Sequence, residues 1–126
     1  NQLVQVFLNL LENSLVAMQN SEEKYLTITG RTRVLDASET WVEITLRDTG
    51  KGIPKNMAQR IFDPFITSKD TGPRSGKTGS GLGLAIVKRI VEAHKGTISI
   101  ENVENGPGVQ AQLRLPKFVE QKSGNE

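Results

Sequence analysis

Three alternating glycines, Gly79, Gly81 and Gly83, stand directly before an apolar, helix-like segment at residues 84–94. Glycine lets the backbone approach a bulky anion closely. The free N–H groups at a helix start point toward that anion, together with the positive end of the helix dipole. The stretch therefore predicts either a phosphate-binding turn or a flexible loop that only precedes a helix.

Two common phosphate-binding loops do not match this chain. The dinucleotide fingerprint needs two residues before its last glycine, whereas residues 79–83 have one between each pair. Residues 72–78 resemble a P-loop, but three residues separate their glycines and the pattern needs four. A phosphate bound here would therefore be held in some other fold.

Asp48 is a second candidate for ligand contact. It ends a strand-like segment at residues 41–48 and has the same parity as Val42, Ile44 and Leu46, which form its apolar face. Burial of an unpaired carboxylate is unfavourable, so we expect Asp48 to have a partner. The residue either binds a ligand or starts the turn at residues 48–52.

Asn9 and Asn13 lie four residues apart in an amphipathic segment at residues 2–19, so we expect them on one flank of a helix. They either present their side-chain carbonyls to a ligand or are solvated. Residues 67–80 form a long polar stretch, typical of a functional or mobile loop. Its cations can reach phosphates or can simply face water; they are Lys69, Arg74 and Lys77.

The elements that must position these residues follow from periodicity. Helices are predicted at residues 2–19, 55–61 and 84–94, and strands at residues 25–35, 41–48, 97–103 and 109–115. This order predicts an α/β (α+β) two-layer sandwich, with a mixed, largely antiparallel sheet covered on one face by about three helices. We expect one domain at residues 1–118 and a polar, disordered tail at residues 119–126.

Composition excludes several classes of function. A net charge of +2 gives no argument for nucleic-acid binding, and no apolar run is long enough to span a membrane. The absence of cysteine excludes thiolate metal sites, and a single histidine, His94, excludes a multi-histidine site. The chain begins within a helical pattern and without Met, so we expect a piece of a longer protein.

Four segments in this order resemble the motifs of the catalytic ATP-binding domain of bacterial sensor histidine kinases, which belongs to the superfamily of gyrase, heat-shock chaperone and mismatch-repair ATPases with a Bergerat-type fold. They are residues 9–13 (N box), 48–53 (first glycine box), 62–69 (F box) and 79–84 (second glycine box). Each motif is weak alone, but the four in order are specific. The match covers nearly the whole chain.

The resemblance implies that the chain binds Mg²⁺ and ATP. It assigns Mg²⁺ to the amide oxygen of Asn13, the adenine amino group to Asp48, and the γ-phosphate to Lys69. Asn13 and Lys69 would be the catalytic residues, and residues 67–80 the ATP lid. The implied nucleotide contacts are Asn9, Asn13, Asp48, Gly50, Gly52, Ile53, Phe65, Lys69, Gly79, Ser80, Gly81, Leu82, Gly83 and Leu84.

The resemblance also implies donation of the γ-phosphoryl group to a histidine on a separate helical-hairpin domain of a homodimeric parent, with a response-regulator receiver domain as a further partner. It implies a cytoplasmic location, compatible with a parent anchored in the inner membrane. The fragment itself would contact neither nucleic acid nor membrane. His94 lies where such domains often have a histidine ending a helix, so its expected role is structural.

One position favours transfer to histidine over hydrolysis. Related ATPases and serine kinases have a glutamate base four residues before the Mg²⁺ asparagine, where this chain has Asn9. An imidazole acceptor already has a lone pair and needs less help. The alternatives are an ATPase or serine kinase that uses Glu12 as base, and a non-enzymatic module whose nucleotide-ordered lid controls partner docking. The roles of Glu12, Arg74 and Lys77 stay open.

Overall fold

The computed structural model describes residues 1–63 and 83–117. Their helices are α1 (Gln2–Ala17), the 3-10 turn η1 (Lys55–Met57) and α2 (Gly83–Ala93). Their strands are β1 (Leu26–Asp36), β2 (Glu39–Asp48), β3 (Thr97–Asn102) and β4 (Val109–Pro116). Within these residues, no helix is both long enough and apolar enough to cross a bilayer.

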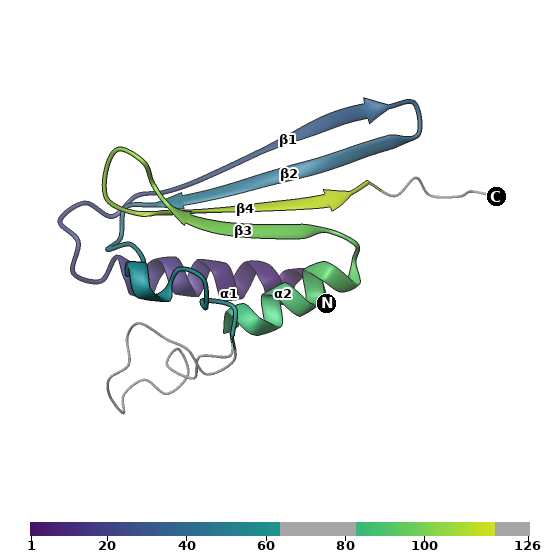
Figure 1. Cartoon of the computed structure of the whole chain (residues 1–126). Helices are drawn as coiled ribbons and strands as arrows, with labels where there is room; N and C mark the ends of the chain where they lie inside the picture. Colours follow the sequence, from purple (N-terminus) through teal and green to yellow (C-terminus); the bar gives the residue numbers. More distant parts are fainter. Residues whose placement is uncertain (64–82, 118–126) are drawn as a thin grey trace.

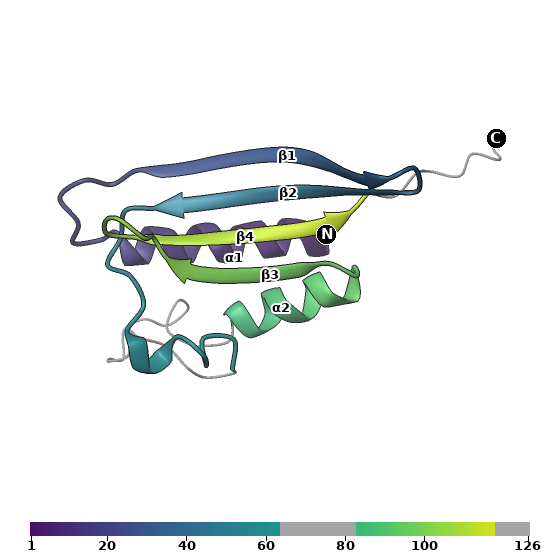
Figure 2. The ribbon, with the colours of Figure 1, turned by 45° about the horizontal axis from the view of Figure 1, so that its top comes forward.

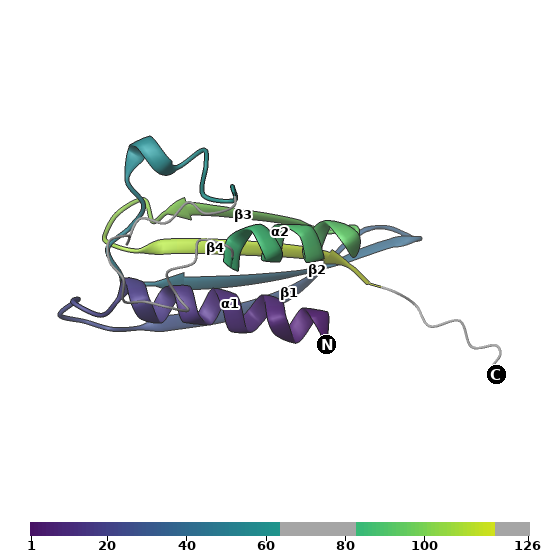
Figure 3. The ribbon, with the colours of Figure 1, turned by 90° about the horizontal axis from the view of Figure 1, so that it is seen from below.

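The four strands form one sheet in the order β1-β2-β4-β3, and each neighbouring pair is antiparallel. Both long helices lie on the same face of this sheet (Figures 1 and 3). The predicted two-layer α+β sandwich is confirmed. The sheet was predicted to be mixed and largely antiparallel, and in the described residues all of its strand pairs are antiparallel.

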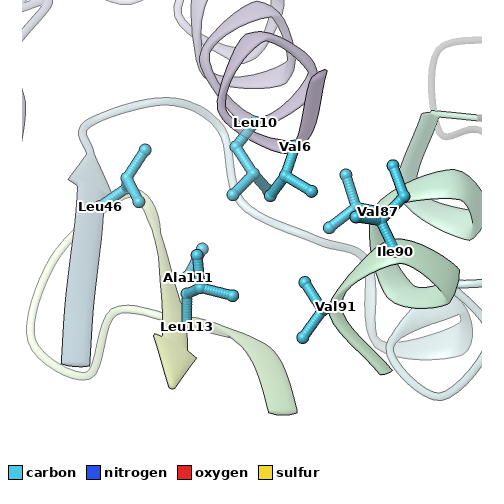
Figure 4. Close-up of a cluster of buried hydrophobic side chains, with 8 residues drawn as sticks. All are labelled: Val6, Leu10, Leu46, Val87, Ile90, Val91, Ala111 and Leu113. Atoms are coloured by element: carbon cyan, nitrogen blue, oxygen red, sulfur yellow. The ribbon is translucent and has the colours of Figure 1, made fainter. Parts of the chain in front are cut away.

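The hydrophobic core lies between the helices and the inner face of the sheet (Figure 4). The side chains point toward one another from both layers; they are Val6 and Leu10 of α1, Val87, Ile90 and Val91 of α2, and Leu46, Ala111 and Leu113 of the sheet. Burial of apolar area at about 25 cal/mol per Å² is the main term holding the layers together. The apolar stripe predicted on the first helix is therefore the face that packs on the sheet.

One local expectation differs from the structure. The helix expected at residues 55–61 is a 3-10 turn of three residues, with further turn hydrogen bonds from Arg60 to Met57 and from Asp63 to Arg60. A segment this short has too few hydrogen bonds to offset helix nucleation. The edge strand β1 also has a largely open apolar face, with Ile28 54% and Val34 70% exposed.

Several chain segments converge at one end of the sandwich, on the left in Figure 1. The C-terminus of α1, the end of β2 and the loop from β3 to β4 meet there, and the N-terminus of α2 faces the same side (Figures 1 and 2). Asp48 is paired in register with Leu26, at the start of β1. Asp48, the last residue of β2, therefore lies at this end of the molecule together with the loop that follows it.

Candidate functional site

Asp48 is the buried acidic residue of this end, with only 4% of its surface exposed. Its Oδ1 accepts two hydrogen bonds, from the backbone N–H of Gly50 at 2.9 Å and of Val109 at 3.1 Å. No hydrogen bond to Oδ2 comes from residues 1–63 or 83–117. The predicted burial and partnering of Asp48 are confirmed, and one carboxylate oxygen organises the loop while the other keeps its capacity as an acceptor.

The loop after Asp48 contains two glycines with different structural requirements. A Cβ at Gly50 would lie 2.7 Å from the Cβ of Ala17 and 2.8 Å from its carbonyl, so this glycine lets the loop rest on the end of α1. The Lys51 N–H donates to the Ala17 carbonyl oxygen at 3.2 Å. Gly52 has φ +86°, a conformation that side chains disfavour. The packing and the conformation of the loop therefore already require glycine at both positions, whether or not a nucleotide base binds next to them.

Two residues of this end were missed in the sequence analysis. Gly108 has φ +116°, and a Cβ there would collide with the Asp48 carbonyl oxygen. The Gly-Pro-Gly run was a signal for a turn, but nothing local linked it to a residue 60 positions earlier. Asn102, at the end of β3, hydrogen-bonds through its side chain to both backbone polar groups of Ile53.

Asn9 and Asn13 lie on α1, one turn apart and half-buried. The Asn9 Nδ2 donates to the carbonyl oxygen of Gly83 at 3.3 Å, and its Oδ1 accepts from the Gln5 Nε2 at 3.1 Å. The Asn13 amide has no hydrogen bond to a described residue, so its oxygen can coordinate a cation or accept a hydrogen bond from a ligand. The neighbouring Glu12 is exposed.

The described side chains here could hold a hard cation only if a bound phosphate and water supplied most of its ligands. Among residues 1–63 and 83–117, no three His, Cys, Asp or Glu side chains are grouped as metal ligands. Mg²⁺ prefers oxygen ligands, keeps several waters and is commonly held by one or two protein groups plus phosphate oxygens. A single amide oxygen such as that of Asn13 suits that arrangement.

Only part of the predicted glycine-rich turn lies in the described chain. Gly83 is the first residue of α2, and Leu84 packs its side chain against the hydrophobic core. The remaining predicted contacts lie outside the described residues; they are Phe65, Lys69, Gly79, Ser80, Gly81 and Leu82, together with the unassigned cations Arg74 and Lys77. The structure therefore brings Asn9 to the start of α2 but leaves the lid contacts as predictions.

His94 and Phe62 complete the surroundings of α2. The His94 Nδ1 lies 2.9 Å from the carbonyl oxygen of Ile90, in the last turn of the helix, which fits the structural role predicted for it. The Lys88 Nζ lies 5.2 Å from the centre of the Phe62 ring, within the range of a cation–π contact. This contact links α2 to the first residue of the predicted F box.

A family profile described as histidine kinase-, DNA gyrase B- and HSP90-like ATPase matches residues 1–118. Sporulation kinase E of Bacillus subtilis is 35% identical over 116 residues, which are 92% of this chain and 14% of that protein. The sensor histidine kinase ZraS of Escherichia coli O157:H7 is 35% identical over 122 residues, which are 97% of this chain and 23% of that protein.

Solved structures show the same fold. The nucleotide-free catalytic domain of the histidine kinase ThkA aligns with a TM-score of 0.69 and 32% identity, covering 92% of this chain and 67% of that one. Full-length ShkA in complex with AMPPNP aligns with a TM-score of 0.65 and 28% identity, covering 90% of this chain and 21% of that one. The chain thus spans less than a quarter of the two curated relatives named above.

Proposed function

The chain belongs to the histidine kinase-, DNA gyrase B- and HSP90-like ATPase family, as a catalytic ATP-binding domain of the histidine-kinase type, and from that membership we propose that it binds Mg²⁺-ATP at the end of the sandwich that holds Asp48. We propose further that it donates the γ-phosphoryl group to a histidine on a separate hairpin domain of its parent protein. The observation that carries the nucleotide proposal is the hydrogen bonding of Asp48.

Asp48 is suited to recognise adenine. Its Oδ1 is occupied by the N–H groups of Gly50 and Val109, which leaves Oδ2 to accept a hydrogen bond from the adenine amino group. Guanine has a carbonyl oxygen in that position, and two acceptors would repel each other. The Asp48 carboxylate should therefore bind ATP in preference to GTP.

The phosphates are proposed to lie along α1 toward the start of α2. Asn13 would offer its amide oxygen to Mg²⁺, and the N-terminus of α2 at Gly83 would face the phosphate charge. Mg²⁺ supplies charge neutralisation to the transferred phosphoryl group. Lys69 and the glycine-rich residues 79–82 are proposed as further phosphate contacts, on the strength of the motifs.

Transfer to an imidazole suits these residues better than attack by water. Phosphoryl transfer depends mainly on positioning and charge stabilisation, and a neutral imidazole nitrogen needs no base to free its lone pair. The Asn9 amide cannot accept a proton, and both its polar atoms are engaged, by Gly83 and by Gln5. The phosphorylated hairpin domain would then pass its phosphoryl group to a response-regulator receiver domain.

The first test of the adenine site is a calorimetric titration of Mg²⁺-ATP and Mg²⁺-GTP into the wild-type chain and into Asp48→Asn. Asparagine keeps the Oδ1 acceptor for both backbone N–H groups but places an NH₂ donor at the Oδ2 position. We expect ATP affinity to fall by about 10- to 100-fold, the equivalent of one hydrogen bond to a charged group, while the preference for ATP over GTP narrows. Unchanged ATP affinity in Asp48→Asn would contradict the assignment.

A second test separates transfer from hydrolysis. The wild-type chain alone is expected to bind ATP with little turnover, because the proposed acceptor histidine belongs to a separate domain. Rapid hydrolysis that disappears in Glu12→Gln would instead identify the exposed Glu12 as the base of an ATPase. Absence of ATP binding, both by this chain and by a longer chain with its neighbouring domain, would contradict the nucleotide proposal.

A further inference from the structure

Asn102 lies at the end of β3, outside all four motifs, yet its side chain is bonded to the first glycine box. Its Oδ1 accepts from the Ile53 backbone N–H at 2.7 Å, and its Nδ2 donates to the Ile53 carbonyl oxygen at 3.1 Å. One side-chain amide therefore pairs with both polar backbone groups of one residue. Among side chains of this length, only asparagine carries an acceptor and a donor side by side for this purpose.

The same amide lies directly beside Gly52, which has a left-handed backbone conformation. This glycine has φ +86°, and a Cβ built on it would lie 3.0 Å from the Asn102 Oδ1. The left-handed residue turns the chain so that the polar groups of Ile53 face β3. The two hydrogen bonds and the glycine conformation thus form one arrangement, in which each part supports the other.

Asn102 fixes the end of the loop at residues 48–53, and other contacts fix the rest of this loop. On the near side, Gly50 rests on Ala17, and Lys51 donates to the Ala17 carbonyl oxygen. At the start of the loop, Asp48 accepts from Gly50. Among the described side chains, Asn102 makes the hydrogen bonds that tie Ile53 to the sheet.

We propose that Asn102 is a positioning residue for the nucleotide pocket, holding the Gly52–Ile53 backbone in the conformation that receives the adenine ring. This inference rests on the proposed ATP binding. Asn102 is exposed and adds no apolar side chain to the core, so its removal changes the loop more than the fold. A loop that samples several conformations binds more weakly, in proportion to the fraction that is competent.

The test compares Asn102→Ala and Asn102→Asp with Asn105→Ala, a matched change at an exposed turn position of the loop from β3 to β4. Asn102→Ala removes both hydrogen bonds, and we expect the dissociation constant for Mg²⁺-ATP to rise about tenfold, since two net hydrogen bonds are worth roughly one such factor. Asn102→Asp keeps the acceptor for the Ile53 N–H but faces its carbonyl oxygen with a second acceptor, so it too should bind ATP more weakly. Asn105→Ala should bind like the wild type.

A second measurement does not depend on nucleotide. Amide hydrogen exchange at Ile53 should be slow in the nucleotide-free wild type and fast in Asn102→Ala, whereas amides of β2 and β4 keep their protection in both. If Asn102→Ala fails to fold, exchange at Ile53 in the wild type and ATP binding by Asn102→Asp still decide the question.

The outcomes separate the two proposals. If the wild type binds ATP and both Asn102 variants bind it equally well, the positioning role is wrong while the nucleotide site stands. A role confined to stability would lower the urea midpoint of Asn102→Ala and leave its ATP affinity unchanged, which also overturns the proposal. Failure of the wild type to bind ATP counts against the proposed function itself, whatever the exchange at Ile53.

Discussion

The Asn9 side chain joins the middle of α1 to the first residue of α2, because its Nδ2 donates to the Gly83 carbonyl oxygen at 3.3 Å. Gln5 orients the same amide by donating to its Oδ1 at 3.1 Å. Two motifs whose bonded residues are 74 positions apart along the chain therefore meet through one hydrogen bond. The amide is a structural link as well as a proposed neighbour of the phosphates.

Asn9→Asp tests this link with almost no change of shape. The aspartate would turn a carboxylate oxygen toward the Gly83 carbonyl, so a donor is lost and two acceptors face each other. We expect the free energy of unfolding, measured in urea, to fall by about 1–2 kcal/mol. The same change at Asn105, an exposed turn residue, should alter it by less than about 0.5 kcal/mol; equal effects at the two positions would show that the Asn9 bond contributes nothing.

Local patterns predicted the four strands, the two long helices and the buried Asp48, because all of these follow from periodicity along a single segment. Parity alone placed Asp48 on the apolar face of β2, and the structure confirms it. The contacts of Asn102 and Gly108 were beyond such reasoning, since they depend on how β3 and β4 meet the loop after β2. Asn102 and Ile53 are 49 residues apart, and no pattern within either segment indicates the other.

Glu43 shows the same limit on the outer face of the sheet. Its parity is opposite to that of Asp48, so sequence alone would place it in solvent. The structure leaves only 3% of it exposed, because arginines from both neighbouring strands close over it: Arg31 and Arg33 of β1 and Arg114 of β4. Such burial requires the register of three strands, which no single segment contains.

Gly108→Ala tests the packing of the β3–β4 loop on Asp48. The substitution places a side chain at φ +116° and drives its Cβ into the Asp48 backbone. A strained conformation of this kind costs about 1–3 kcal/mol, and the collision adds to it, so we expect a loss of about 2 kcal/mol or more in a urea titration. Gly106→Ala is the control, because a Cβ there meets no atom within 4 Å, and a comparable loss at both glycines would refute the explanation.

Leu113→Ala tests the central strand of the core. Leu113 is fully buried and lies in β4 beneath the two helices. Truncation of a buried leucine removes apolar contact and leaves a cavity, so the expected loss is about 2–5 kcal/mol of unfolding free energy. Leu8→Ala, at a position 56% exposed on α1, should lose much less; a small effect at Leu113 would mean that the layers close over the missing atoms.

Glu43 should make stability depend on pH in the acid range. A hydrogen bond from Arg31 and the positive charges of Arg33, Arg31 and Arg114 lower the pKa of Glu43 below its ordinary value of 4.5, while burial opposes the shift. Because the folded pKa lies below the unfolded one, the carboxylate stabilises the fold fully above about pH 4.5, and this contribution is lost as the pH falls through the folded pKa.

Urea unfolding of the wild type and of Glu43→Gln between about pH 7 and pH 3 measures this effect, because glutamine cannot titrate. We expect the wild type to be more stable by a constant amount at neutral pH, and the difference to shrink as Glu43 takes up its proton. The pKa of Asp36 is also lowered, chiefly by a hydrogen bond from the Ser38 N–H, but Asp36 is present in both proteins and cancels in the difference. A difference that stays constant down to pH 3 would show that the three arginines do not favour the charged form of Glu43.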